Sequence, residues 1–348
     1  MTFASAYDSR SNNFGAFRFL QAAVIIFYHC QVLSGRVPAA EQTVWFQLAI
    51  GMLDCFFFLS GFLVTQSWLA APALRLYVPK RLLRLMPAMV VALVFGAFVV
   101  GPLATSGSAG AYLLSSEPWR HFLGILSPPY LVSPTCFVDN PFPKFINGPL
   151  WSLRYEFVCY ALVPLLGALP ERWMRWGTAA LLAWFWGIVL SGRTPAWMPA
   201  PMPPLMACFM AGMAFWVFRE RVPYTAALAV PALGLLAVTL FTHGFREVFP
   251  LAGGYVFFYA GFAPRLRLRR WSHLGDFAYG LYVFTYPMQQ LLVHYFGAGI
   301  PLGVYYVASF GLGLALAVSC WRFIEEPALR LKPGAKGTAG RANVTRAS

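Results

Sequence analysis

The chain has 348 residues, of which 59% are hydrophobic and only 11% are charged, and its formal net charge is +14. A soluble domain would carry roughly 25% charged residues, so the composition excludes an ordinary soluble enzyme. Lys and Arg gather in short segments between apolar runs, a pattern typical of membrane topology signals beside anionic lipids. The positive charge therefore needs no nucleic acid partner.

Apolar runs recur along the whole chain, each with about the 20 residues that a helix needs to cross a bilayer. The ten expected spans are Ala16–Leu33, Val44–Leu69, Leu85–Thr105, Pro149–Leu169, Trp173–Ser191, Pro203–Phe218, Val222–Thr242, Val248–Pro264, Leu274–Phe296 and Pro301–Phe323. The predicted fold class is all-α, a polytopic transmembrane bundle of about ten helices. The sixth and eighth runs are short, and losing both would leave eight spans.

Basic residues predict the orientation of this bundle. With the N-terminus in the cytoplasm, twenty Lys and Arg fall on the cytoplasmic side and five fall outside. Such a bias favours an even number of spans with both chain ends in the cytoplasm. We expect residues 1–15 to form a cytoplasmic segment, residues 16–331 the transmembrane domain, and residues 332–348 a disordered cytoplasmic tail.

One long segment, Ser106–Gly148, lies outside in this topology. Its aromatic residues and prolines predict a partly helical cap on the membrane, and loops of this length are usually functional. The six cysteines show no spacing typical of a metal site, so we expect no metal.

Four charged or titratable residues fall inside the expected spans, where they are costly and therefore candidates for function: His29, Asp54, Arg154 and Glu156. His29 lies roughly 6 Å and Glu156 about 10 Å from the external ends of their spans. A buried imidazole and a buried carboxylate at similar depth would suit a general base and its orienting partner. The alternative is a hydrogen-bonded pair that joins two helices.

The other two intramembrane charges are open to more than one interpretation. Asp54 fits a helix contact or a pore-lining group as well as a functional one. Arg154 fits neutralisation of either Glu156 or Asp54.

A basic run precedes the third span, from Arg75 to Arg84. Arg81 and Arg84 are three residues apart, so they share a helix face and could clamp phosphates. Long basic side chains that anchor the helix at the membrane surface are the competing interpretation.

Several motifs occur together in a fixed order. They are Arg18 with His29 after ten residues; Asp54 through Ser60, Gly61 and Phe62; Lys80-Arg81 through Arg84 to Pro87; Asn147 through Trp151-Ser152 to Glu156; Phe277 through Tyr279 and Tyr282 to Tyr286-Pro287; and Arg322 through Glu325 to Pro327. This ordered set resembles the membrane-bound acyltransferase 3 family, whose members O-acylate, mostly O-acetylate, bacterial surface glycans and related molecules. The resemblance extends over nearly the whole chain.

The resemblance implies a role for each matching residue. His29 would be the catalytic base or a transient acyl carrier, and Glu156 the acidic residue that follows the Trp-Ser motif. Arg81 and Arg84, with Arg18, would bind acyl-CoA. The supporting residues are Asp54, Ser60, Asn147, Trp151, Arg154 and Tyr282.

Two features depart from the family pattern. Many members carry a His in the aromatic stretch before the ninth-span proline, where this chain has Phe284-Thr285-Tyr286. The segment after Trp151-Ser152 offers one carboxylate, Glu156, where two are common. The resemblance therefore implies a site with one His and one carboxylate.

The expected activity is transfer of an acyl group, most simply acetyl from acetyl-CoA, to a hydroxyl of a cell-surface or exported glycan. An alcohol is a weak nucleophile near neutral pH, so a positioned base is required. Ser60, Asn147 or a nearby Arg would stabilise the oxyanion. The resemblance implies a bacterial inner-membrane enzyme with a lipid-linked acceptor and membrane lipids as partners.

Two other functions fit a polytopic bundle. One is a transporter or flippase of lipid-linked sugars or small solutes, although the sequence shows no internal repeat of the kind that many transporters have. The other is a structural partner of a polysaccharide synthase.

Overall fold

The computed structural model describes residues 1–8, 12–38, 43–125, 132–242, 244–263, 268, 274 and 276–333. Over these ranges the protein is helical, with three isolated β-bridges. The all-α class expected from the sequence is confirmed. Most of the basic run Arg265–Arg270 and residues 334–348 of the predicted tail lie outside the described residues.

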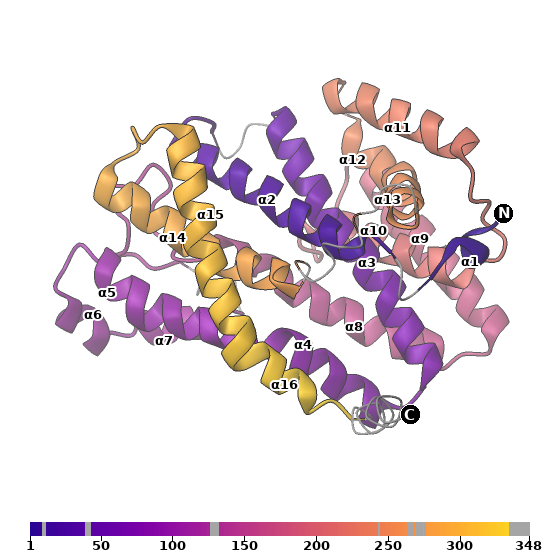
Figure 1. Ribbon diagram of the computed structural model, residues 1–348, viewed down its shortest axis with the longest axis horizontal. Coiled ribbons are helices and arrows are strands. Elements are labelled where there is room, and N and C mark those ends of the chain that lie inside the picture. Colours follow the sequence, from indigo (N-terminus) through magenta and orange to yellow (C-terminus); the bar gives the residue numbers. More distant parts are fainter. Residues whose placement is uncertain are drawn as a thin grey trace, which may run out of the picture.

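Helices make up most of the described chain (Figure 1). In chain order they are α1 Phe3–Ala6, α2 Phe14–Leu33, α3 Val44–Ala70, α4 Leu74–Phe95, α5 Gly101–Ala104, α6 Ala109–Leu114, α7 Glu117–Phe122, α8 Leu153–Gly167, α9 Glu171–Ser191, α10 Met202–Val217, α11 Ala226–Phe241, α12 Phe245–Val248, α13 Gly254–Gly261, α14 Ala278–Phe296, α15 Leu302–Cys320 and α16 Glu326–Arg330. Non-α turns extend several of them: the π-helical η1 Gly96–Val100, η5 Phe249–Gly253 and η8 Trp321–Glu325, and the 3-10 turns η2 Leu123–Ile125 and η4 Gly148–Ser152.

Four continuous helical stretches are long and apolar enough to cross a membrane. They are Phe14–Leu33, Val44–Ala70, Leu74–Ala104 and Leu302–Arg330. Helices also lie over the six remaining apolar runs expected to span. Together these helices make the chain a multi-pass membrane protein.

Helices α3 and α10 touch backbone to backbone at the centre of the molecule (Figure 1). A Cβ atom at Gly61 of α3 would lie 2.1 Å from the Phe209 carbonyl oxygen, and one at Gly212 of α10 would lie 2.0 Å from the Phe58 carbonyl oxygen. Small residues permit such close approach in membrane bundles, where van der Waals packing drives helix association. This contact fixes α3 against α10.

The N-terminal segment is docked on the bundle. Phe3 is buried, and its amide donates a hydrogen bond to the Val222 carbonyl oxygen at 3.1 Å. The Tyr7 hydroxyl donates to Gln66 Oε1 at 2.8 Å. The start of the segment that is expected to be cytoplasmic therefore packs against the helices of the bundle.

The segment before α8 runs down the side of α14. Asn140 Nδ2 bonds Gln290 Oε1 at 2.9 Å, and Asn147 Nδ2 bonds the Val283 carbonyl oxygen at 2.8 Å. These two anchor points are seven residues apart on α14, or roughly 10 Å at the rise of an α-helix. The residues before α8 therefore pack along α14, and α8 itself begins only at Leu153.

Helices α5, α6 and α7 gather at one end of the molecule, at the left of Figure 1. The expected external segment is partly helical over the residues that are described. It packs on the bundle through the buried side chains of Tyr112, Cys136 and Phe137. We call this end the cap end, and the opposite end, with Arg75, Lys80, Arg81 and Arg84 of α4, the basic end.

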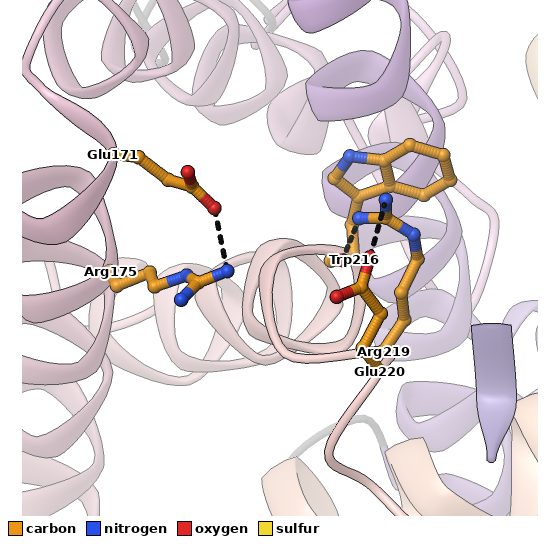
Figure 2. Close-up of polar contacts among 5 residues, drawn as sticks. All are labelled: Glu171, Arg175, Trp216, Arg219 and Glu220. Atoms are coloured by element: carbon orange, nitrogen blue, oxygen red, sulfur yellow. Dashed lines mark hydrogen bonds and ion pairs between the residues drawn. The ribbon is translucent and has the colours of Figure 1, made fainter.

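Ion pairs in the described part of the chain lie at the surface, near helix ends. Figure 2 shows two of them, Glu171–Arg175 on α9 at 2.6 Å and Arg219–Glu220 after α10 at 3.6 Å. The Arg219 guanidinium also lies 4.3 Å from the centre of the Trp216 ring. Exposed pairs of this kind contribute roughly 0–1 kcal/mol, so they are minor contributors to stability.

Candidate active site

A cavity of about 140 Å³ lies between α2, α3, α4, α8 and α14. It brings together six residues that the sequence singles out, although they come from distant parts of the chain. They are Arg18, Ser60, Arg81, Arg84, Glu156 and Tyr282. Three further polar residues, Ser152, Tyr160 and Tyr279, complete its polar lining.

The spacing of residues along each helix determines which of these side chains reach the cavity. Arg81 and Arg84 project from one face of α4 because residues three apart are neighbours on a helix. Arg18 stands in the second turn of α2, near its start. The Tyr279 hydroxyl donates to the Leu85 carbonyl oxygen at 2.9 Å and ties α14 to α4 beside the cavity.

The cavity holds more positive than negative charge. Arg18, Arg81 and Arg84 share its lining with one carboxylate, that of Glu156. From outside the lining, the charge of Asp276 acts on Arg18, and Glu325 interacts with Arg84. Among the described residues, none of the four lining groups belongs to an ion pair. Guanidinium groups gathered in one site can bind phosphate or another anion.

Arg81 is held in place at the edge of the cavity. Its Nη2 donates to Ser67 Oγ at 3.3 Å, and its guanidinium lies 5.8 Å from the ring centres of both Tyr77 and Tyr160. Its Nε has no hydrogen-bond partner within the described chain. The side chain is therefore positioned by aromatic rings and keeps a donor available.

Glu156 accepts two hydrogen bonds in the cavity. The Tyr160 hydroxyl donates to Glu156 Oε1 at 2.5 Å, and Ser60 Oγ donates to the same oxygen at 3.3 Å. Sequence reasoning missed Tyr160, although its spacing of four residues from Glu156 puts both on one helix face. The carboxylate is thus fixed between α3 and α8.

His29 lies away from the cavity. It is eleven residues from Arg18 on α2, or roughly 16 Å along the helix axis. Its ring makes an edge-to-face contact with Tyr286, with centres 5.3 Å apart and planes at 87°. No hydrogen bond joins it to a described residue, so the expected contact with Glu156 is absent. Glu156 instead lines the cavity with Arg81 and Arg84.

Helix α14 connects the cavity with His29. Tyr282 lines the cavity, and its hydroxyl is 2.7 Å from Ser152 Oγ and 2.8 Å from the Pro149 carbonyl oxygen. Tyr286, one turn further along, contacts His29 on one side and Gly148 on the other, where a Cβ would lie 3.0 Å from its ring. A row of tyrosines therefore leads from the cations to the imidazole.

Asp54 and Arg154 have other surroundings than those expected. Asp54 is buried on α3 with Oδ1 unpartnered among the described residues, and Arg246 of α12 is the cation whose charge acts on it. The Arg154 guanidinium lies 4.6 Å from the Tyr155 ring centre, and Nη2 bonds the Tyr155 hydroxyl at 2.6 Å. Neither lines the cavity, and Arg154 forms no ion pair with Glu156 or Asp54.

Asn147 and Trp151 act in the packing of the segment that leads into α8. The Asn147 Nδ2 donates to the Val283 carbonyl oxygen, and Asn147 Oδ1 has no hydrogen-bond partner among the described residues. The Trp151 ring packs edge-to-face on Tyr155, with centres 5.8 Å apart. That Asn147 stabilises an oxyanion stays a prediction.

A family model described as an acyltransferase domain matches residues 12–322. The chain belongs to the acyltransferase 3 family. The resemblance read from the six ordered motifs is confirmed, since the match includes all of the helices that line the cavity and nearly all of the chain.

Two relatives in the acyltransferase 3 family are similar over most of their lengths. Nodulation protein 10 of Rhizobium leguminosarum bv. viciae is 25% identical over 92% of this chain and 94% of its own. The O-acetyl transferase of Shigella phage Sf6 is 23% identical over 82% of this chain and 86% of its own. No solved structure matches the chain significantly. Family membership and helical architecture together identify a membrane acyltransferase.

Proposed function

We propose that this protein is an integral membrane O-acyltransferase that transfers an acyl group, acetyl in the simplest case, from acyl-CoA to a hydroxyl of a cell-surface or exported glycan. The observation that carries the proposal is the group of three guanidinium ions, Arg18, Arg81 and Arg84, in one cavity, none of which forms an ion pair with a described residue. CoA carries phosphates that such a group binds well.

The proposed topology has ten spans, with both chain ends in the cytoplasm of the bacterial inner membrane. The excess of basic residues on one side supports it. The basic end then faces the cytoplasm, where acyl-CoA is made, and the cap end faces outward. His29 lies on the outer side of the cavity in this arrangement, nearer to a lipid-linked glycan acceptor.

The donor would lie along α14. Its phosphates contact the arginines of the cavity, and its pantetheine arm passes Tyr282 and Tyr286 toward His29. The distance of roughly 16 Å along α2 between Arg18 and His29 suits a ligand with a long, thin arm. The separation of cations from imidazole supports a donor that carries its charge at one end and its reactive group at the other.

In the proposed reaction, His29 takes the proton of the acceptor hydroxyl while the hydroxyl oxygen attacks the thioester carbonyl carbon. A C–O bond forms, the C–S bond breaks, and the CoA sulfur leaves with the proton that His29 returns. Alternatively, His29 would carry the acyl group briefly. In that case His29 first accepts the acyl group from the donor and then passes it to the acceptor hydroxyl. Glu156 lies in the cavity, where hydrogen bonds from Ser60 and Tyr160 hold it beside the arginines.

The test is transfer of label from radioactive acetyl-CoA to host glycans in isolated membranes. His29→Ala should abolish transfer with the protein still folded in the membrane. His294→Ala is the matched control, because His294 lies at the far end of α14, where its ring packs on Phe137. Labelled glycan from His29→Ala would overturn the base assignment, and a transporter of lipid-linked sugars would leave no label in any variant.

A further inference from the structure

Two lysines extend the positive charge of the active-site cavity at the basic end. Lys80 lies four residues before Arg84 on the same face of α4, or roughly 6 Å along the helix axis. Lys332 follows α16, which packs against α4 (Figure 1). The Lys332 amide donates to the Leu329 carbonyl oxygen at 3.3 Å, so the chain turns back onto the end of α16. Neither lysine belongs to the described lining of the cavity.

Lys332 is half-buried among other cations. The charges of Arg84, Arg81 and Lys80 all act on its amine. One carboxylate, that of Asp276, opposes them. No ion pair in the described part of the chain includes Lys80 or Lys332. Because like charges in a partly buried place are costly, an anion that binds among them is stabilised.

This arrangement matches the two anionic groups at the nucleotide end of CoA. The diphosphate and the 3′-phosphate are attached to the same ribose, so a site for both needs two neighbouring groups of cations. Arg18, Arg81 and Arg84 offer one group in the cavity. We propose that Lys80 and Lys332 form the second group and bind the 3′-phosphate of the acyl donor.

Phospholipid headgroups carry the same phosphate chemistry and are the competing source of the anion. Basic side chains that anchor a helix among headgroups are exposed, as Arg75 and Arg330 are at this end of the molecule. Lys332 is instead half-buried beside the arginines of the cavity. Its position therefore favours the phosphate of the donor.

The inference rests on the proposed function, so its test compares two donors. 3′-Dephospho-acetyl-CoA has the thioester, the arm and the diphosphate of acetyl-CoA but lacks the 3′-phosphate. With the unmodified protein, its KM should exceed that of acetyl-CoA at least about tenfold, because two charge-assisted contacts are lost. The kcat should be the same for both donors.

Lys332→Met keeps most of the side chain and removes its charge. The KM for acetyl-CoA should rise about fivefold, as expected for the loss of one partly exposed charge pair. The KM for 3′-dephospho-acetyl-CoA should not change, because this donor has no 3′-phosphate. Lys80→Met should act in the same way, and the double variant should give both donors the same KM.

Arg330→Met is the matched control. Arg330 is a basic residue two positions before Lys332, but its side chain is 75% exposed and pairs with Glu326 at 2.9 Å. Removing its charge should leave the ratio of the two KM values as it is in the unmodified protein. A fall in this ratio as large as that in Lys332→Met would show that net charge alone sets the preference, and would overturn the inference.

The remaining outcomes separate this inference from the proposed function. If the unmodified protein transfers from neither donor, the proposed function fails. Equal KM values for the two donors in the unmodified protein would overturn the inference alone, and so would lysine variants that raise both KM values equally. Assays in phosphatidylcholine vesicles with and without phosphatidylglycerol test the lipid. If Lys332→Met keeps the KM ratio but loses a dependence on phosphatidylglycerol, the lysines bind lipid instead.

Discussion

The active-site cavity has a charged lining, whereas the described contact of the His29 ring is with an aromatic side chain. The cavity gathers three arginines and a carboxylate from three helices, whereas His29 faces the ring of Tyr286 and has no hydrogen-bonded partner in the described chain. Roughly 16 Å of α2 separates the two regions. In the proposed reaction, donor binding and proton transfer are therefore separate tasks, so substitutions in the two regions should change different kinetic constants.

The largest effect is expected at the imidazole. His29→Gln keeps a polar side chain of similar size but removes the base, so kcat should fall by about 10²–10⁴-fold with little change in the KM for the donor. Steady-state transfer of label from acetyl-CoA measures both constants. A raised KM with an unchanged kcat would show that His29 contributes to binding and not to the chemical step. The two regions would then no longer differ in function.

A smaller effect of the opposite kind is expected at the arginines. Arg84→Gln removes one charge-assisted contact with a phosphate, worth about 1.5–3 kcal/mol, so the KM should rise about 10- to 100-fold. The kcat should change little, because Arg84 lies far from His29. Unchanged binding of acetyl-CoA by isothermal calorimetry in this variant would argue against a phosphate site in the cavity.

Acetyl-CoA binding should also depend weakly on pH through Lys332, which follows α16. Burial, together with the charges of Arg84, Arg81 and Lys80, lowers the pKa of the Lys332 amine to about 8. The amine is protonated below this value and neutral above it, so a cation is lost as pH rises. The KM should increase about two- to fivefold between pH 7 and pH 9, and Lys332→Met should flatten this profile. An identical profile in the variant would exclude Lys332 as its cause.

The smallest effect is expected at the surface ion pair on α9 (Figure 2). Arg175→Gln should change the free energy of unfolding by only about 0.3–0.5 kcal/mol and neither kinetic constant, because the pair is partly exposed and distant from the cavity. Thermal unfolding in detergent and the transfer assay check this together. A large kinetic effect would show that any lost arginine disturbs the enzyme, and would weaken the argument from Arg84.

The sequence predicted the helices and part of the site because both depend on local spacing. Long apolar runs placed helices over the ten expected ranges, and the three-residue spacing of Arg81 and Arg84 put both on one face. The ordered motifs also brought Arg18, Ser60 and Tyr282 into the prediction. Patterns of this kind depend only on neighbouring residues, so they can be predicted without knowledge of the tertiary structure.

The depth of Glu156 could not be predicted in the same way. It depends on the residues between Asn140 and Ser152, which are not α-helical and pack along α14. A count of 1.5 Å per residue assumes a helix from the membrane surface onward and fails where the chain enters as a loop. Arg246 beside Asp54 was missed for a related reason, since only the tertiary packing of α12 against α3 brings them together.

The glycine contact between α3 and α10 has a consequence for the hydroxyl of Ser60. Neighbouring residues point about 100° apart around a helix, so Gly61 can rest on the Phe209 carbonyl oxygen while Ser60 faces Glu156. Turning α3 about its axis would drive side chains into the backbone of α10. The contact therefore acts as a rotational stop, and any opening that admits substrate must come from helices on the other side of the cavity.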